Sequence, residues 1–321
     1  MASADDRTTD VLLTDVHAHF VTDDYVAAAR AAGIEHPDGM PAWPDWGLDA
    51  QLADMDRRRI GRAILSISSP GVHFGDDAAA AALARDVNDA AADLVAARPG
   101  RLSFFASLPL PDVEAARTEA RRALALPGAR GVILESHAQG QYLGDPALEP
   151  LWADLEAAGA IVFVHPTSPV GAEGTDLGRP RPMLEFMADS TRSIVDLVLA
   201  GVLERHPALQ VVVPHSGASL ALLSDRVALF QSAFGLGGMP FASALQRLWF
   251  DLAGTPFPHA APLLARVAGE EHLLYGSDSC WTPAPAVDAL LESIEQADPP
   301  ASATSWRALT ARNADRLLGE G

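Results

Sequence analysis

Short apolar runs alternate along the chain with Ala-rich amphipathic segments. Eight runs rich in Val, Ile, Leu and Phe have the length and composition of buried strands. They cover residues 11–16, 62–68, 102–108, 131–135, 161–165, 210–214, 248–252 and 272–276. Buried strands that alternate with helical segments are typical of a parallel sheet with helices on its outside.

The segments between these runs show the spacing of helices, and several begin after Asp or Pro and end near Gly. The clearest helical patterns cover residues 76–97, 112–126, 147–158, 191–204, 218–230, 260–268, 285–297 and 302–318. Together with a length of 321 residues, eight strand-and-helix repeats predict an α/β fold of the (β/α)₈ TIM-barrel type. We expect residues 9–321 to form a single barrel domain and residues 1–8 to be disordered or extended.

Two stretches interrupt this alternation and are rich in Pro and Gly. The first, residues 34–48, follows the first strand, and the second, residues 166–182, follows the fifth. Both are predicted to be loop insertions at the carboxyl ends of strands, where barrel enzymes place their active sites.

The overall charge limits the class of partner. The formal net charge is −19, with a sequence pI near 4.7, so nucleic acid and anionic membrane surfaces would be repelled. A carboxylate substrate would need local arginines or a metal to reverse this field. No apolar run of about 18 residues is present to span a membrane. The single cysteine, Cys280, and a start without a signal-peptide pattern favour a cytoplasmic protein.

Every basic residue in the chain is an arginine, and lysine is absent. This absence excludes Schiff-base chemistry, a P-loop lysine and a carbamylated lysine that bridges two metals.

Four metal-binding side chains are predicted to meet at one rim of the barrel. His17 and His19 are two residues apart at the end of the first strand, so they share a face. His165 ends the fifth strand, and Asp278 follows the eighth. Three imidazoles and a carboxylate suit one divalent ion, Zn²⁺ first, with Mn²⁺ or Fe²⁺ as alternatives.

Two further side chains follow strands at this rim. His215, after the sixth strand, could be another ligand, a general acid or base, or an electrophile that polarises a substrate oxygen. Asp251, at the end of the seventh strand, could orient a metal ligand.

The motifs in this strand order resemble those of the amidohydrolase superfamily, in the branch that contains aminocarboxymuconate-semialdehyde decarboxylase. The similar segments are residues 15–20, 164–166, 215–217 and 275–278. The resemblance implies that His17, His19, His165 and Asp278 are the metal ligands and that His215 and Asp278 are catalytic. Dinuclear members commonly use a carbamylated lysine at strand four. The sequence here is Glu135-Ser136-His137, which favours a single metal.

The same resemblance suggests residues that contact the substrate. Arg226 matches an arginine that reaches into the neighbouring subunit's site, which implies a homodimer or higher homo-oligomer; the alternative is a helix-surface arginine paired with Asp225. No arginine occurs between residues 34 and 48 to match a second substrate-binding arginine. Trp43 and Trp46 stand there instead, and they suggest a less charged, more aromatic substrate.

The pattern Trp43-Pro44-x-Trp46, followed by Ser68-Ser69-Pro70-Gly71, looks most similar to decarboxylases of small hydroxybenzoates such as 6-methylsalicylate. Three other side chains near strand ends are further candidates for substrate contact. They are Phe20, His73 and Trp281. For His73, a role on an exposed loop is the alternative.

These features predict a metal-dependent non-oxidative decarboxylase, a carbon–carbon lyase, acting on a small aromatic or dienoic carboxylic acid. The same ligands could lower the pKa of a bound water, so hydrolysis of a lactone or amide is the alternative reaction. The non-enzymatic alternative is a barrel without catalytic activity that serves as a binding scaffold.

Overall fold

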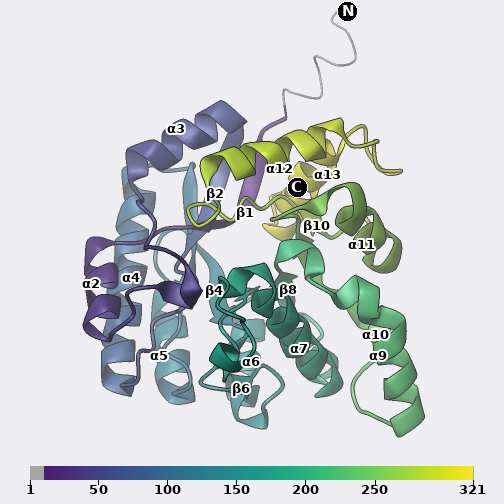
Figure 1. Ribbon diagram of the computed structural model, residues 1–321, viewed down its shortest axis with the longest axis horizontal. Coiled ribbons are helices and arrows are strands. Elements are labelled where there is room, and N and C mark those ends of the chain that lie inside the picture. The colour runs from purple at the N-terminus through teal and green to yellow at the C-terminus, as the bar shows by residue number, and fades with distance from the viewer. Residues whose placement is uncertain (1–10, 321) are drawn as a thin grey trace, which may run out of the picture.

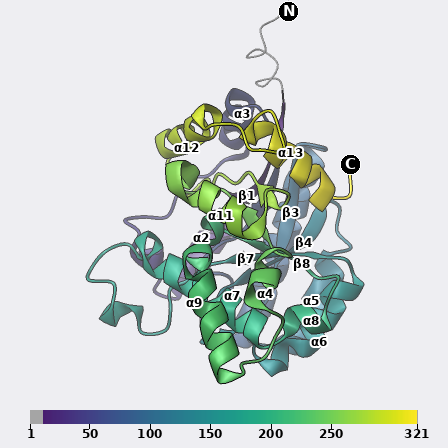
Figure 2. The same cartoon turned by 90° about the vertical axis from the view of Figure 1, so that its right-hand side faces the viewer.

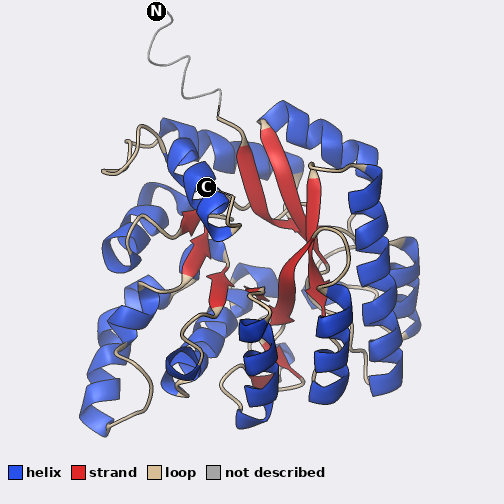
Figure 3. Cartoon of the chain, turned by 180° about the vertical axis from the view of Figure 1, so that it is seen from behind, coloured by secondary structure: helices blue, strands red, loops and turns tan. Residues whose placement is uncertain are grey.

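The computed structural model describes residues 11–320, so the prediction for residues 1–8 lies outside the described part of the chain. A central sheet of parallel strands is enclosed by helices (Figures 1 and 3). Its eight strands, in spatial order, are β1 (Leu13–His19), β2 (Ile60–Ser66), β3 (Leu102–Ser107), β4 (Ala129–Glu135), β7 (Ile161–His165), β8 (Gln210–Val213), β9 (Trp249–Asp251) and β10 (Leu273–Leu274).

Backbone hydrogen bonds between β1 and the residues that follow β10 bring the two ends of the sheet together. The Val16 amide donates to the Tyr275 carbonyl at 3.0 Å, and the Asp278 amide donates to the His17 carbonyl at 2.7 Å. The predicted (β/α)₈ TIM barrel is thereby confirmed.

Each predicted apolar run overlaps one of these strands, but the first strand is displaced. β1 continues to His19, whereas the apolar run ends at Val16. Asp15, His17 and His19 are fully or almost fully buried in this strand. The run of apolar residues ends early because the last residues of the strand form a buried polar site.

Helices flank most of the strands. They are α2 (Asp23–Ala31), α3 (Leu48–Arg58), α4 (Asp77–Ala97), α5 (Val113–Ala123), α6 (Glu149–Ala157), α7 (Glu185–Leu199), α8 (Val202–Arg205), α9 (Leu220–Phe234), α10 (Phe241–Leu245), α11 (Ala261–Ala268), α12 (Ala284–Gln296) and α13 (Trp306–Leu317). The side chains of Asp76, Asp112 and Ser305 each cap the start of a helix by accepting a backbone amide hydrogen bond. α2 and α3 were not among the predicted helices. The helix predicted over residues 191–204 is divided at Gly201, whose φ of 76° ends α7.

Side chains fill the interior of the barrel. One buried cluster takes a residue or two from each strand of the barrel: Val16, Ile64, Phe105, Ile133, Ile161, Phe163, Val212, Trp249 and Leu274. Ala314 and Leu317 of α13 belong to the same cluster. The barrel is therefore a packed core rather than a pore, and a substrate site has to lie at its rim.

Three segments elaborate the carboxyl rim. The segment after β1 contains α2, the 3₁₀ turn η1 (Pro37–Gly39) and α3. The segment after β4 contains the hairpin of β5 (His137–Ala138) and β6 (Gln141–Tyr142). The segment after β7 contains the 3₁₀ turns η3 (Ala172–Gly174) and η4 (Arg181–Met183), and Figure 2 shows it projecting from the body of the molecule. Within residues 11–320, no helix combines the length and apolar character needed to cross a membrane.

Candidate active site

The structure brings together the four predicted metal ligands from three strand ends. One nitrogen or oxygen atom from each of His17, His19, His165 and Asp278 lies within 4.8 Å of the others. The imidazole centroids of these histidines are 4.8 to 5.4 Å apart. The three histidines are buried, and the Asp278 side chain is 19% exposed.

A partner at Nδ1 orients each of the three imidazoles. His17 Nδ1 lies 2.8 Å from the Asp251 carboxylate. His19 Nδ1 lies 3.0 Å from the Ser66 hydroxyl, and His165 Nδ1 lies 2.7 Å from the Pro166 carbonyl. These contacts leave Nε2 of each ring as the candidate ligand atom.

The donor set fits a divalent metal. Nε2 of His17 and of His19 is buried and has no hydrogen-bond partner in the described part of the chain. These atoms lie 3.4 and 3.3 Å from Asp278 Oδ1, longer than a strong charge-assisted hydrogen bond. Two buried nitrogens without hydrogen-bond partners therefore face one carboxylate, and a metal ion bound between them would give each nitrogen a partner.

The carboxylate of Asp278 is held in its charged form. Burial opposes ionisation, but contacts with the imidazoles of His17, His19 and His215 bring the pKa of Asp278 well below its usual value. Thr282 Oγ1 donates to Asp278 Oδ2 at 3.0 Å. A negatively charged ligand is therefore available at the centre of the site.

His215 lies beside this group on a tightly turned segment. Its Nε2 is 3.5 Å from Asp278 Oδ2, and its Nδ1 is buried with no partner among the described residues. His215 and Ser216 have φ values of 53° and 54°, a left-handed conformation that is costly for side chains of this kind. This backbone conformation holds the His215 imidazole beside the Asp278 carboxylate.

Asp251 connects two parts of the site. One oxygen contacts His17 Nδ1, and the other accepts the backbone N–H of His215 at 3.0 Å. The carboxylate is completely buried. Its place at the end of a strand was the only signal for it in the sequence, and the two contacts make it a positioning residue for both histidines.

A cavity of about 230 Å³ is lined by two of the four grouped side chains, His165 and Asp278, and we call it the metal-site cavity. Its walls combine aromatic and apolar residues with two carboxylic acids, two imidazoles and several hydroxyls. The lining residues are Asp38, Met40, Ser68, Ser69, His165, Pro182, Phe186, His215, Asp278, Trp281, Thr282 and Pro283.

Of the six side chains expected to contact the substrate, Trp281 lines this cavity. Trp43 is buried behind it, with ring centroids 5.8 Å apart, and donates from Nε1 to the Ile34 carbonyl. Trp46 packs on Phe20 with ring centroids 5.9 Å apart. Trp43, Trp46 and Phe20 are not among the lining residues, and Trp43 supports the wall through its contact with Trp281.

The two remaining candidates lie elsewhere. His73 lines a neighbouring cavity, and its Nε2 is 2.8 Å from the Asp77 carboxylate. Arg226 is exposed on α9, with its guanidinium 4.9 Å from the centroid of the Phe230 ring. Neither lines the metal-site cavity of its own chain.

Sequence reasoning missed Asp38, which the loop after β1 carries into the metal-site cavity. Its side chain accepts a hydrogen bond from Ser168 Oγ at 2.5 Å, and Arg181 Nη1 donates to that hydroxyl at 3.2 Å. Burial raises the pKa of Asp38, although the hydroxyls of Ser168 and Ser69 act against this rise. The Pro37-Asp38-Gly39 turn indicated only a loop, because Asp is common in turns for local reasons.

Comparison with known proteins places this chain in a family. The 6-methylsalicylic acid decarboxylase of Penicillium expansum is 34% identical over 275 residues, which cover 82% of this chain and 83% of the relative. A crystal structure of an amidohydrolase II has 33% identity and a TM-score of 0.89, and the match covers 96% of this chain and all of that one.

A dihydroxybenzoic acid decarboxylase from a Polaromonas species, solved with manganese and the inhibitor 2-nitroresorcinol, has the same fold. Its TM-score is 0.82 at 20% identity, with 96% of this chain and 97% of that chain covered. The sequence model of the family described as Amidohydrolase matches residues 14–319. With that match spanning almost the whole chain, the protein belongs to the amidohydrolase family.

Proposed function

We propose that the protein is a metal-dependent decarboxylase that removes CO₂ from a small hydroxybenzoate without an oxidant. The observation that carries this proposal is the group of three oriented imidazoles and a carboxylate, of which His165 and Asp278 line the metal-site cavity together with the aromatic side chains of Phe186 and Trp281. The Penicillium relative, named for decarboxylation of 6-methylsalicylic acid, supports the same reaction and substrate class.

His17, His19, His165 and Asp278 would hold one divalent metal. When bound, the ion would act as a Lewis acid and a template for the substrate carboxylate and the neighbouring ring oxygen. Imidazole and carboxylate ligands suit Zn²⁺ and Mn²⁺, and the manganese in the Polaromonas decarboxylase makes Mn²⁺ the first ion to test.

The reaction requires the protein to deliver one proton to the substrate ring. The ring carbon that carries the carboxylate gains a proton, the bond to the carboxylate carbon then breaks, and its electron pair restores the aromatic ring as CO₂ leaves. His215 Nε2 and Asp278 Oδ2, 3.5 Å apart, can pass a proton between them. This pair would deliver the proton to the ring and take another from water after turnover.

The cavity walls favour an aromatic acid with a single carboxylate. Phe186 and Trp281 offer ring faces, and no arginine is among the lining residues. Asp38 would repel a second carboxylate on the ring and could accept a hydrogen bond from a ring hydroxyl. A hydroxybenzoate therefore suits the site better than a dicarboxylic muconate.

Arg226 would complete the site from a second copy of the chain. The helix that carries it, α9, exposes Leu222, Leu229, Phe230 and Phe234. Exposed apolar side chains grouped on one helix are typical of a face that a partner covers. We therefore propose a homodimer in which α9 belongs to the interface.

The direct test is incubation of the Mn²⁺-loaded protein with 6-methylsalicylate under nitrogen. We expect stoichiometric release of CO₂ and 3-methylphenol. Turnover of lactones or amides without CO₂ release from any hydroxybenzoate would contradict the proposal. If a metal were bound but no substrate of either class reacted, the binding-scaffold alternative would replace it.

A further inference from the structure

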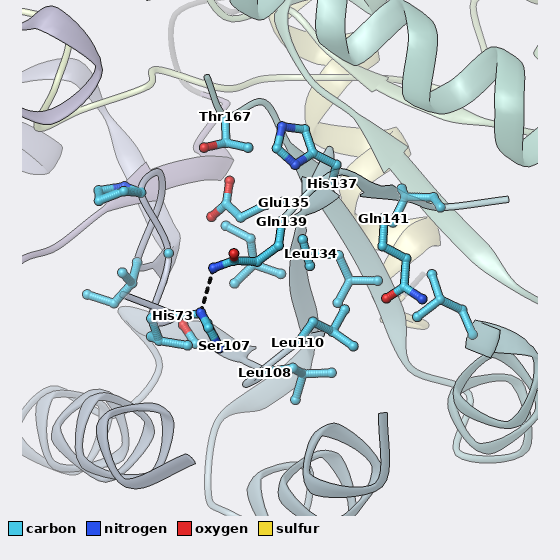
Figure 4. A pocket seen from close by; sticks show the side chains of 18 residues that line it. His73, Ser107, Leu108, Leu110, Leu134, Glu135, His137, Gln139, Gln141 and Thr167 are labelled. Carbon is cyan, nitrogen blue, oxygen red and sulfur yellow. Dashed lines mark hydrogen bonds between the residues drawn. The ribbon is translucent and has the colours of Figure 1, made fainter. Parts of the chain in front are cut away.

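A second cavity of about 220 Å³ lies at the same rim, beside β2, β3 and β4, and we call it the lateral cavity (Figure 4). The loops after these strands and the β5–β6 hairpin surround it. It is lined by Ile67, Pro70, Gly71, Val72, His73, Ser107, Leu108, Leu110, Ile133, Leu134, Glu135, His137, Ala138, Gln139, Gln141, Leu143, Leu148 and Thr167. None of these residues lines the metal-site cavity.

A thin wall separates the two cavities. Ser69 lines the metal-site cavity, Thr167 lines the lateral cavity, and their hydroxyl oxygens are 2.7 Å apart. Glu135, on the lateral side, has Oε2 at 3.6 Å from Nδ1 of His165. A molecule in the lateral cavity would therefore lie next to the proposed reaction site.

Two buried acceptor atoms belong to residues that line the lateral cavity. Oε2 of Glu135 and Oε1 of Gln141 are buried and have no hydrogen-bond partner in the described part of the chain. A buried acceptor without a donor costs about 1–3 kcal/mol. The rest of the wall combines aliphatic side chains such as Leu108, Leu110 and Leu134 with polar ones, so an occupant with an apolar body and a hydroxyl group would satisfy both features of the cavity.

A hydrogen bond holds two sides of the lateral cavity together. Gln139, on the turn between β5 and β6, has Nε2 at 2.8 Å from His73 Nδ1 on the loop after β2 (dashed line in Figure 4). Asp77 holds the other nitrogen of His73 at 2.8 Å. These contacts connect segments that are far apart in the sequence and preserve the shape of the space between them.

We propose that the lateral cavity is a binding site for a neutral monocyclic phenol, the chemical class of the decarboxylated product. The identification of this class as the product rests on the proposed function. A cavity of about 150 Å³ is enough for benzene, so the lateral cavity has room for a substituted ring. No arginine lines it to balance a carboxylate, and burying an unpaired charge is costly, so it would select the neutral phenol over the acid.

The test is calorimetric titration of the Mn²⁺-loaded protein with 3-methylphenol. A ligand of this size should bind with a Kd on the order of 1 mM. Ala138→Phe, which would fill the cavity, should remove this binding. Gln141→Leu, which removes one acceptor, should weaken it roughly fivefold.

Two control variants separate this site from the metal-site cavity and from general effects. Met40→Trp would narrow the metal-site cavity and should slow turnover while 3-methylphenol binding persists. Gln296→Leu, at an exposed position on α12, should change neither property. Melting temperatures of all four variants would show that each is folded.

Binding that survives Ala138→Phe and Gln141→Leu but disappears in Met40→Trp would place the phenol in the metal-site cavity and overturn the proposal. So would the absence of binding up to about 10 mM, because water alone would then account for the cavity. The titration needs no turnover. A protein that binds 3-methylphenol at the lateral cavity but never releases CO₂ would keep the phenol site and lose the proposed function.

Discussion

The two cavities at the carboxyl rim have nearly the same volume, about 230 and 220 Å³, but the polar groups around them are arranged differently. Beside the metal-site cavity, Nδ1 of each of the three grouped imidazoles has a hydrogen-bond partner, which leaves Nε2 directed toward Asp278 in His17 and His19. Among the residues that line the lateral cavity, Glu135 and Gln141 each have one buried oxygen without a hydrogen-bond partner in residues 11–320. The first arrangement fits the proposed metal ion, whereas the second fits the proposed phenol.

This difference has a physical origin. A metal ion needs several ligands whose lone pairs converge, so each ring must be fixed by a group behind it. A phenol needs an aliphatic space and one or two acceptors, and these acceptors must be unoccupied before it binds. The same barrel rim provides both arrangements because different strand ends contribute the side chains.

Removal of a metal ligand should give the largest effect and would test the metal-site half of the comparison. We expect His17→Ala and Asp278→Ala to lose stoichiometric Mn²⁺ and to lower kcat/KM by roughly a thousandfold or more, since Lewis-acid assistance contributes several kcal/mol. Metal analysis and CO₂ release measure the two effects. His259→Ala, at an exposed position, is the matched control. Full metal content in either ligand variant would contradict the assignment.

Asp251 should have the next largest effect, because it touches His17 and the backbone of His215 without reaching the proposed metal. Asp251→Asn should weaken Mn²⁺ affinity about 10- to 100-fold, measured by competition with a chelator. Asp225→Asn, on the exposed part of α9, controls for loss of a carboxylate. If Asp251→Asn kept the affinity of the unaltered chain, the orientation of His17 would not depend on this contact.

Asp38 should control which acids enter the metal-site cavity. Asp38→Asn keeps the size of the side chain and removes its charge. We expect the kcat/KM ratio of 5-carboxyvanillate to 6-methylsalicylate to rise about tenfold, because a like-charge contact of somewhat over 1 kcal/mol is lost. Asp45→Asn, in the same loop but not among the lining residues, should leave the ratio unchanged. If the ratio were unchanged in Asp38→Asn, Asp38 would not determine which acids the enzyme accepts.

The wall between the cavities should give the smallest effect. Ser69→Ala removes the hydroxyl that contacts Thr167 across the wall. One lost hydrogen bond is worth about 1 kcal/mol, so KM for the acid and Kd for 3-methylphenol should each change about two- to fivefold. Steady-state kinetics and calorimetry measure them, with Ser293→Ala on α12 as the control. If only KM or only Kd changed, the Ser69–Thr167 contact would not affect both cavities.

Much of the fold followed from local patterns. The eight apolar runs located every strand of the barrel, because a buried parallel strand has to be apolar on both faces. The β5–β6 hairpin could not be found in this way, since each of its strands has two residues. The start of the barrel was also difficult to place, because the second half of β1 is polar and is buried only by the site that it forms.

The sequence by itself determined the candidate ligands His17, His19, His165 and Asp278, since side-chain alternation and position at a strand end place them at one rim. It also excluded lysine chemistry by composition. Only the tertiary structure decided that Asp38 enters the metal-site cavity, that Trp43 and Trp46 are not among its lining residues, and that Glu135 and Gln141 each have one oxygen without a hydrogen-bond partner in the described part of the chain. Those properties depend on which distant segments pack together, and a local pattern of residues carries no information about contacts across more than a hundred positions.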